Sequence, residues 1–145
     1  MRAEWQRAAA YVVCRDGADR MLLTRFVQAG SPASGSWSMP GGGMEWGERP
    51  EHTALRELHE ETGFDADLGP LLGIYSEWIE PGRTARRSAG HVFGAVYAAS
   101  ITAGELRTEF DLDDTTDAAA WFSFAEISSL RRVPLVDFAV DLVRS

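Results

Sequence analysis

The feature that most constrains this sequence is a group of acidic side chains repeated at helical spacing. Pro50 suits the first turn of an α-helix, and Gly63 suits the position just past its end. On a helical wheel of about 100° per residue, Glu57, Glu60 and Glu61 share one arc, and the apolar residues of the segment lie on other arcs. We therefore predict a helix with one carboxylate face and one core face.

Three carboxylates on one arc repel one another, by roughly a few tenths of a kcal/mol per pair. Their position near the C-terminal end of the helix adds an unfavourable interaction with the helix macrodipole. Bound Mg²⁺ or Mn²⁺ would offset both effects, because these cations prefer carboxylate, carbonyl and water oxygens. The alternative is a solvated acidic face, since glutamate is a good helix former and the chain has a net charge of −8.

The rest of the chain predicts a mixed α/β domain. Apolar and β-branched runs predict strands at residues 8–14, 21–26, 37–39, 71–79, 91–100, 105–108 and 119–124. Three glycines follow Pro40 and allow a sharp bend and close approach to a ligand. Pro134 opens a second helix with an apolar stripe. This order of elements indicates a mixed sheet packed between helices, in a single domain of residues 1–145.

Charge and composition exclude several classes of function. All 14 basic residues are arginines, so neither a Schiff-base lysine nor a lysine-dependent phosphate loop is available. The arginines are scattered through an acidic chain, which argues against a nucleic-acid polymer as partner. Cys14 lies in an apolar run and is interpreted as a buried structural thiol. No run approaches the roughly 20 apolar residues of a membrane span, so we expect no membrane partner and a cytoplasmic location.

The stretch from Gly42 to Phe64 resembles the Nudix box, the signature of the MutT-like Nudix hydrolase family. The residues that match its defining positions are Gly42, Glu48, Arg56, Glu57, Glu60, Glu61 and Gly63. Residues 21–25, 37–43 and 115–117 are similar to segments common elsewhere in the family. The resemblance extends over nearly the whole chain, although only the box is highly specific.

This resemblance implies a fold and a chemistry. The family fold is an α/β/α sandwich around a mixed β-sheet, in agreement with the elements predicted above. Family members hydrolyse a nucleoside diphosphate linked to another moiety, generally with Mg²⁺ or Mn²⁺. In the matching positions, Glu57, Glu60 and Glu61 would hold the metal, and the backbone carbonyl of Gly41 would complete the site. We therefore expect a small-molecule nucleotide as the substrate.

The resemblance also implies supporting residues. Arg56 and Glu48 are expected to pair, which would fix the loop against the helix and orient the glutamates. Gly63 would end the helix, and Phe64 would pack into the core. Trp46 lies in the same loop, where it would either touch the substrate or serve in packing.

The sequence alone does not identify the proton acceptor or the residues that contact phosphate. The proton of the attacking water would pass to Glu57 or Glu60, or to an acid in a later loop, as in several family members. The later candidates are Glu109, Asp113, Asp114 and Asp117. The candidate phosphate contacts are Arg25, Arg83, Arg86 and Arg87. For each of these four later acids and four arginines, the sequence favours an ordinary surface residue.

We predict metal-dependent hydrolysis of a diphosphate linkage in a nucleoside diphosphate-linked substrate, of the nucleoside triphosphate or ADP-ribose type. One alternative is a nucleotide-sensing Nudix domain without catalysis; loss of box glutamates would mark that class, and all are present here. A related prenyl diphosphate isomerase is disfavoured, because Cys14 lies in the first strand and the chain is short. A homodimer is a further expectation, since family members are frequently dimers.

Overall fold

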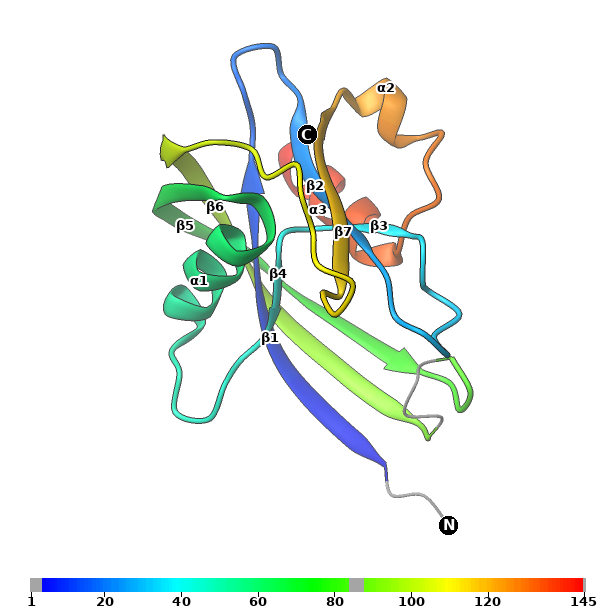
Figure 1. Cartoon of the computed structure of the whole chain (residues 1–145). Helices are drawn as coiled ribbons and strands as arrows, with labels where there is room; N and C mark the ends of the chain where they lie inside the picture. The colour runs from blue at the N-terminus through cyan, green and yellow to red at the C-terminus, as the bar shows by residue number, and fades with distance from the viewer. Residues whose placement is uncertain (1–3, 84–87, 145) are drawn as a thin grey trace.

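The computed structural model describes residues 4–83 and 88–144. The strands are β1 (Trp5–Cys14), β2 (Met21–Phe26), β3 (Trp37–Ser38), β4 (Gly41–Gly43), β5 (Phe64–Ile79), β6 (Gly90–Gly104) and β7 (Thr116–Phe122). The helices are α1 (Pro50–Thr62), α2 (Phe124–Ile127) and α3 (Pro134–Val143), and Figure 1 shows their arrangement. No helix in these two ranges is both long and apolar enough to cross a membrane.

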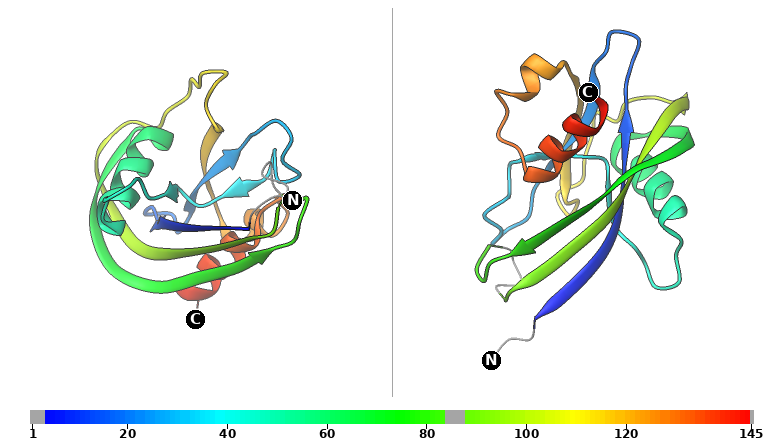
Figure 2. Two further views of the ribbon diagram at one scale, coloured as in Figure 1. Left: turned by 90° about the horizontal axis from the view of Figure 1, so that it is seen from below. Right: turned by 180° about the vertical axis from the view of Figure 1, so that it is seen from behind.

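The strands form two sheets. The larger sheet is mixed and has the order β4-β1-β6-β5, with β1 and β6 parallel and the other two pairs antiparallel. The smaller sheet is antiparallel and has the order β3-β2-β7. Helices α1 and α3 lie on opposite sides of the curved larger sheet (Figure 2). The predicted mixed α/β fold is confirmed, and the division into two sheets is a detail that strand patterning did not predict.

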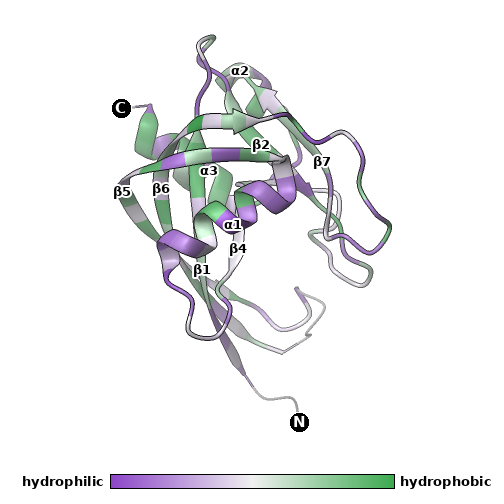
Figure 3. Ribbon diagram, turned by 60° about the vertical axis from the view of Figure 1, so that its left-hand side comes forward, coloured by the Kyte–Doolittle hydropathy of each residue, from purple (hydrophilic) through white to green (hydrophobic). Residues whose placement is uncertain are grey.

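Opposite faces of β1 enter two hydrophobic clusters. Val12 shares one cluster with Leu58 of α1, and Val13 shares the other with Val136 of α3. Because successive side chains of a strand point to opposite faces, β1 is covered on both sides. Figure 3 shows the matching division along α1, whose ribbon alternates between hydrophobic and hydrophilic stretches. Cys14 is fully buried in the first cluster, and burial raises the pKa of its thiol to about 12, as expected for a structural cysteine.

Helix α1 begins and ends where the sequence predicts. It runs from Pro50 to Thr62, and Gly63 follows with a left-handed φ of 82°. A Cβ at Gly63 would lie 2.3 Å from the carbonyl oxygen of Glu105. Glycine is therefore required both by the backbone conformation and by the close approach of the segment after β6.

The strand predicted at residues 105–108 is wrong, because that segment is irregular. The backbone N–H of Arg107 donates to the carbonyl of Thr62 at 2.8 Å, and its side chain donates to the carbonyl of Glu60 at 2.8 Å. These donors satisfy carbonyls at the end of α1, which have no partners within the helix. Strands β5 and β6 are longer than predicted, since their pairing runs from Phe64 opposite Gly104 to Ile79 opposite Gly90.

Helix α2 is an element that the sequence reading missed. The side chain of Ser123 accepts a hydrogen bond from the backbone N–H of Glu126, whose carboxylate accepts one from the backbone N–H of Ser123. This arrangement is a capping box, and the Ser-x-x-Glu spacing is the signal that could have identified the helix. The strand predicted at residues 119–124 therefore ends at Phe122, before this helix. It begins earlier than predicted, at Thr116.

Strand β4 brings the site together. The chain bends at Pro40, and the three glycines that follow form a short strand, antiparallel to residues 9–11 of β1. They carry no side chains, so α1 can approach this edge of the sheet closely. The carboxylate face of α1 is thereby brought to the edge of the larger sheet.

Candidate active site

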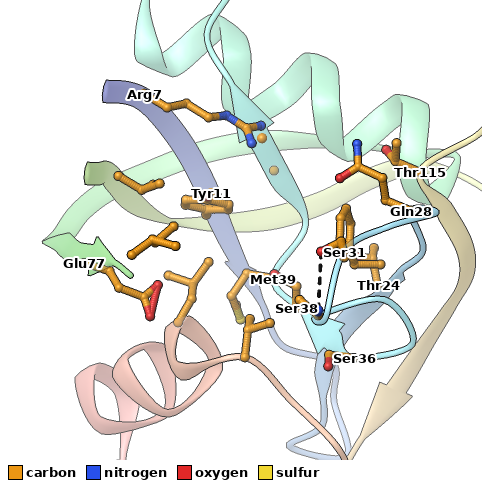
Figure 4. A pocket seen from close by; sticks show the side chains of 18 of the residues that line it. Arg7, Tyr11, Thr24, Gln28, Ser31, Ser36, Ser38, Met39, Glu77 and Thr115 are labelled. Carbon is orange, nitrogen blue, oxygen red and sulfur yellow. Dashed lines mark hydrogen bonds between the residues drawn. The ribbon is translucent and has the colours of Figure 1, made fainter. Parts of the chain in front are cut away.

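A cavity of about 840 Å³ is lined by residues of both sheets and of α1. Figure 4 shows Arg7 and Tyr11 projecting into it from β1, with Gln28 on the opposite wall. Glu57 and Glu61 of α1 line the same cavity together with Gly41 and Gly42 of β4. Two box carboxylates therefore meet side chains from distant parts of the chain.

Both carboxylate oxygens of Glu61 accept hydrogen bonds. The backbone N–H of Gly41 donates to Oε1 at 2.8 Å, and the hydroxyl of Thr116 donates to Oε2 at 3.2 Å. Burial raises the pKa of Glu61 to about 8; the Gly41 bond opposes the rise, and the negative charge of Glu57 adds to it. The carboxyl of Glu61 is therefore harder to ionise than a solvent-exposed glutamate when no cation is bound.

Glu57 lies against the glycine strand. A Cβ at Gly42 would lie 3.0 Å from the Glu57 carboxylate, so even alanine at that position would crowd it. Burial raises the pKa of Glu57 as well, and the positive charge of Arg56 opposes that rise. Two partly buried carboxylates in one cavity are unfavourable as anions unless a positive charge joins them.

The expected pair of Arg56 and Glu48 is confirmed. Nε and Nη2 of Arg56 donate to Oε2 and Oε1 of Glu48 at 2.7 and 2.9 Å. The Glu48 side chain is only 5% exposed and also accepts from the hydroxyl of Thr53 at 2.6 Å. Hydrogen bonds from Arg56 and Thr53 hold the pKa of Glu48 well below its usual range. Nη1 of Arg56 also donates to Glu57 at 3.1 Å, which links the loop to the carboxylates of α1.

Glu60 lies in a different environment from Glu57 and Glu61. Its side chain is 55% exposed, and its Oε2 lies 3.2 Å from Nη1 of Arg56. It does not line the cavity. The three glutamates share one side of the helix, but that arc is about 100° wide and the cavity meets only part of it.

The oxygen atoms at this wall fit a hard divalent cation. Mg²⁺ and Mn²⁺ prefer carboxylate and carbonyl oxygens, which Glu57, Glu61 and the backbone of β4 offer. Among the residues that the structure describes, no group of three or more His, Cys, Asp or Glu side chains forms a metal cage. Mg²⁺ commonly binds through one or two protein carboxylates together with water and substrate phosphates. Two carboxylates on a cavity wall suit that mode of binding.

The acids suggested for a later loop lie away from the cavity. They are Glu109, Asp113, Asp114 and Asp117, and none of them lines it. Asp117 pairs with Arg25 at 2.7 Å, and Asp114 pairs with Arg107 at 2.8 Å. These contacts stabilise the loop and strand in which the acids occur.

The four arginines suggested as phosphate contacts separate in the structure. Arg83 lines the cavity. Arg25 does not; its guanidinium pairs with Asp117 and lies over the ring of Trp37. Arg86 and Arg87 lie outside the described residues.

Two aromatic residues near the box have opposite environments. Trp46 is fully exposed, at 103%, so the packing interpretation of this residue is wrong. It does not line the cavity, and its contact with a substrate stays a prediction. Phe64 packs against the cluster that contains Leu58, as expected.

Several cavity residues were not singled out from the sequence. Glu77 lines the cavity from β5, and the period-two alternation that places it on one strand face with Tyr75 and Ile79 is the available signal. The sequence around Thr116 and around Arg7 has no pattern that would identify either residue as part of the cavity. Thr116, for example, lies 55 positions from the carboxylate that it contacts.

Comparisons of the amino-acid sequence identify proteins that are similar to this chain. The family model described as the NUDIX domain matches residues 5–141. An ADP-ribose pyrophosphatase of Methanocaldococcus jannaschii is 33% identical over 120 residues, which are 83% of this chain and 60% of that protein. Diphosphoinositol polyphosphate phosphohydrolase 3-alpha of Mus musculus is 38% identical over 72 residues, which are 50% of this chain and 42% of that protein. The chain thus spans less than two thirds of the length of either relative.

Solved structures share the fold. A MutT Nudix hydrolase from Burkholderia pseudomallei has a TM-score of 0.79 at 25% identity, covering 95% of this chain and 98% of that one. A Nudix hydrolase from Nitrosomonas europaea has a TM-score of 0.77 at 24% identity, covering 96% of this chain and 88% of that one. Since the NUDIX model also matches residues 5–141, the chain belongs to the Nudix hydrolase family.

Proposed function

We propose that this chain hydrolyses a diphosphate linkage in a nucleoside diphosphate-linked small molecule, with Mg²⁺ or Mn²⁺ held at Glu57, Glu61 and the backbone of Gly41. The observation that carries the proposal is that both carboxylates line one cavity with the glycine strand. When bound, such a cation supplies positive charge for phosphate oxygens and makes water easier to deprotonate. It would also relieve the unfavourable burial that raises the pKa of both glutamates.

The chain's own side chains orient these two carboxylates. Arg56, fixed through both oxygens of Glu48, donates to Glu57. Gly41 and Thr116 fix the two oxygens of Glu61. Restricting the rotation of both carboxylates keeps a bound diphosphate aligned for attack. We assign Arg56 and Glu48 a positioning role, and Glu60 belongs to the same network through its contact with Arg56.

Glu57 is the proton acceptor that this geometry favours. Of the two box glutamates and four later acids considered for that role, Glu57 lines the cavity and the others do not. Arg56 donates to its Oε1, which leaves Oε2 to accept a proton from the attacking water.

We infer a substrate of the ADP-ribose or nucleoside triphosphate type. The cavity volume of about 840 Å³ lies within the usual range of small-molecule sites. Tyr11, Phe26 and Tyr75 contribute aromatic surface to it, which suits a nucleoside. The name of the M. jannaschii relative makes ADP-ribose the first compound to test.

The deciding experiment is a turnover panel with product identification by chromatography. It contains ADP-ribose, nucleoside triphosphates, dinucleoside polyphosphates, nucleotide sugars and a diphosphoinositol polyphosphate, each with Mg²⁺ or Mn²⁺. We expect at least one compound to be cleaved at a diphosphate linkage, with activity abolished by EDTA. Binding of a nucleotide without any cleavage across the panel would favour the nucleotide-sensing alternative.

Three broader expectations are part of the same proposal. They are one Nudix domain over residues 1–145, a homodimer and a cytoplasmic location. The homodimer is tested by light scattering after size-exclusion chromatography, where a mass near 15.9 kDa would contradict it. The location is tested by fractionation of the source cells.

A further inference from the structure

Arg7 is a charged cavity residue to which the proposed mechanism assigns no role. It projects from β1 on the same side as Tyr11, and its side chain extends toward β4 (Figure 4). It is exposed and, within residues 4–83 and 88–144, forms no hydrogen bond or ion pair through its guanidinium. Its donors are therefore available to a ligand.

The unpaired guanidinium of Arg7 differs from those arginines of the chain that a carboxylate neutralises. Within the described part of the chain, six arginines form ion pairs with aspartate or glutamate: Arg15, Arg20, Arg25, Arg56, Arg107 and Arg132. Arg132 also lines the cavity, but it donates to Asp137 and to the carbonyls of Ile127, Ser128 and Leu130. Arg132 thus has a structural task that Arg7 lacks.

The glycines of β4 give Arg7 its position. A Cβ at Gly43 would lie 2.5 Å from Nε of Arg7, and a Cβ at Gly42 would lie 3.0 Å from the Glu57 carboxylate. The φ of Gly43 is not left-handed, so the backbone conformation does not require glycine there. The backbone of Gly42 and Gly43, which carries no side chains, therefore lies between the unpaired guanidinium of Arg7 and the carboxylate of Glu57. The two opposite charges lie near each other without forming an ion pair.

We propose that Arg7 binds a substrate phosphate adjacent to the one attacked, and that this contact selects substrates with a polyphosphate chain. The planar guanidinium presents paired donors that match phosphate oxygens. The inference rests on the proposed function, in which a diphosphate binds at the cation held by Glu57 and Glu61; the contact with Arg7 places that diphosphate along β4, between Arg7 and Glu57. The phosphate of a substrate with a single phosphate would bind beside Glu57 and Glu61, and Arg7 would then have no phosphate to contact.

The first test measures equilibrium binding, so that it does not depend on turnover. Analogues of ATP and ADP-ribose in which a methylene group replaces every oxygen that bridges two phosphorus atoms are titrated calorimetrically, with Mg²⁺, into the wild type, Arg7→Gln and Arg7→Lys. We expect Arg7→Gln to weaken binding by about 10- to 100-fold, the range that corresponds to hydrogen bonds with charged groups. Arg7→Lys should keep part of the affinity, because it retains the charge and loses the paired donors.

Arg20→Gln is the matched control. It removes one arginine whose guanidinium pairs with Asp16 at 2.7 Å, outside the cavity. It should bind both analogues like the wild type. The difference between the wild type and Arg7→Gln should also shrink as salt is added, since screening weakens an ionic contact at an exposed site.

Gly43→Ala provides a second test in which Arg7 itself is retained. The added Cβ must displace the end of the Arg7 side chain, which is flexible, so we expect weaker binding without loss of folding. The double variant Arg7→Gln/Gly43→Ala should then be no weaker than Arg7→Gln alone. Additive losses would show that Gly43 acts independently of Arg7 and would count against the inference.

The outcomes separate this inference from the proposed function. Weaker binding by Arg7→Gln together with an inactive turnover panel would retain the phosphate contact and reject hydrolysis. Normal turnover together with an unchanged dissociation constant and KM in Arg7→Gln would reject the contact and retain hydrolysis. Failure of the wild type to bind either analogue would overturn both.

Discussion

Arg56 and Glu48 form a two-pronged ion pair in which Nε donates to Oε2 at 2.7 Å and Nη2 donates to Oε1 at 2.9 Å. The pair joins the loop after β4 to α1. The remaining terminal nitrogen of Arg56 contacts Glu57 at 3.1 Å and Glu60 at 3.2 Å. The orientation of the proposed metal-binding face therefore depends on a carboxylate that lies outside the cavity.

Glu48→Gln should lower both activity and melting temperature, because an amide cannot accept two charge-assisted bonds from the guanidinium. We expect kcat to fall by about 10- to 100-fold, as for other residues that orient metal ligands. Glu45→Gln is the matched control, since Glu45 is 72% exposed and 3.8 Å from Arg56. Equal effects of the two variants, measured by steady-state kinetics and thermal unfolding, would argue against the positioning role of Glu48.

Glu61→Gln should lose most activity and stay folded, because it removes a ligand charge at nearly constant volume. We expect kcat to fall by more than about 100-fold, beyond the range for residues that only orient ligands. Glu60→Gln should lose less, since Glu60 does not line the cavity. Wild-type turnover in Glu61→Gln, with Mn²⁺ binding unchanged in a titration, would contradict the metal assignment.

The metal-free protein should lose stability as pH rises from about 4.5 to about 8. Burial raises the folded-state pKa of Glu61 from 4.5 to about 8, so the folded state binds more protons than the unfolded state within that window. The free energy of unfolding then falls with pH by at most about 1.4 kcal/mol per pH unit from this one group. Urea titrations in EDTA should show this slope, and the slope should be smaller in Glu61→Gln, where the raised pKa of Glu57 remains. A slope of the same size in both proteins would assign the effect to other groups.

Thr116→Val should reduce activity because it removes the hydrogen bond to Oε2 of Glu61 and keeps the side-chain shape. We expect kcat/KM to fall by about 10-fold, as for other contacts that orient a ligand. The Thr116 bond lowers the pKa of Glu61, so its loss should also move the acidic limb of the pH–rate profile upward. Thr116→Ser keeps the hydroxyl and should restore both properties; failure to restore them would point to packing instead.

Gly63→Ala should destabilise the fold by about 1–3 kcal/mol, the usual cost of a side chain in a left-handed conformation. The structure adds a steric reason, since the Cβ would lie 2.3 Å from the carbonyl oxygen of Glu105. Gly17→Ala is the control, because no atom lies within 4 Å of its added Cβ and its φ is not left-handed. Chemical denaturation measures both variants, and equal stabilities would contradict the assigned role of Gly63.

Errors in the sequence-based fold have identifiable causes. The strand predicted at residues 105–108 does not form, because Arg107 of this segment donates its hydrogen bonds to the end of α1. The glycines after Pro40 form a strand that was not predicted, because they pair with β1. In both segments a partner distant in the sequence overrides the local pattern.

The sequence by itself determined the carboxylate helix, its two ends and the family signature, because these features depend on residues within a few turns of one another. It also indicated the pair of Arg56 and Glu48, which lie eight positions apart. Only the tertiary structure decided that Glu57 and Glu61 enter the cavity while Glu60 stays outside it. It also brought Thr116 to Glu61 and Arg7 to the glycine strand. The physical reason is that periodicity determines which face of an element is polar, whereas the packing of strands from distant segments determines what that face meets.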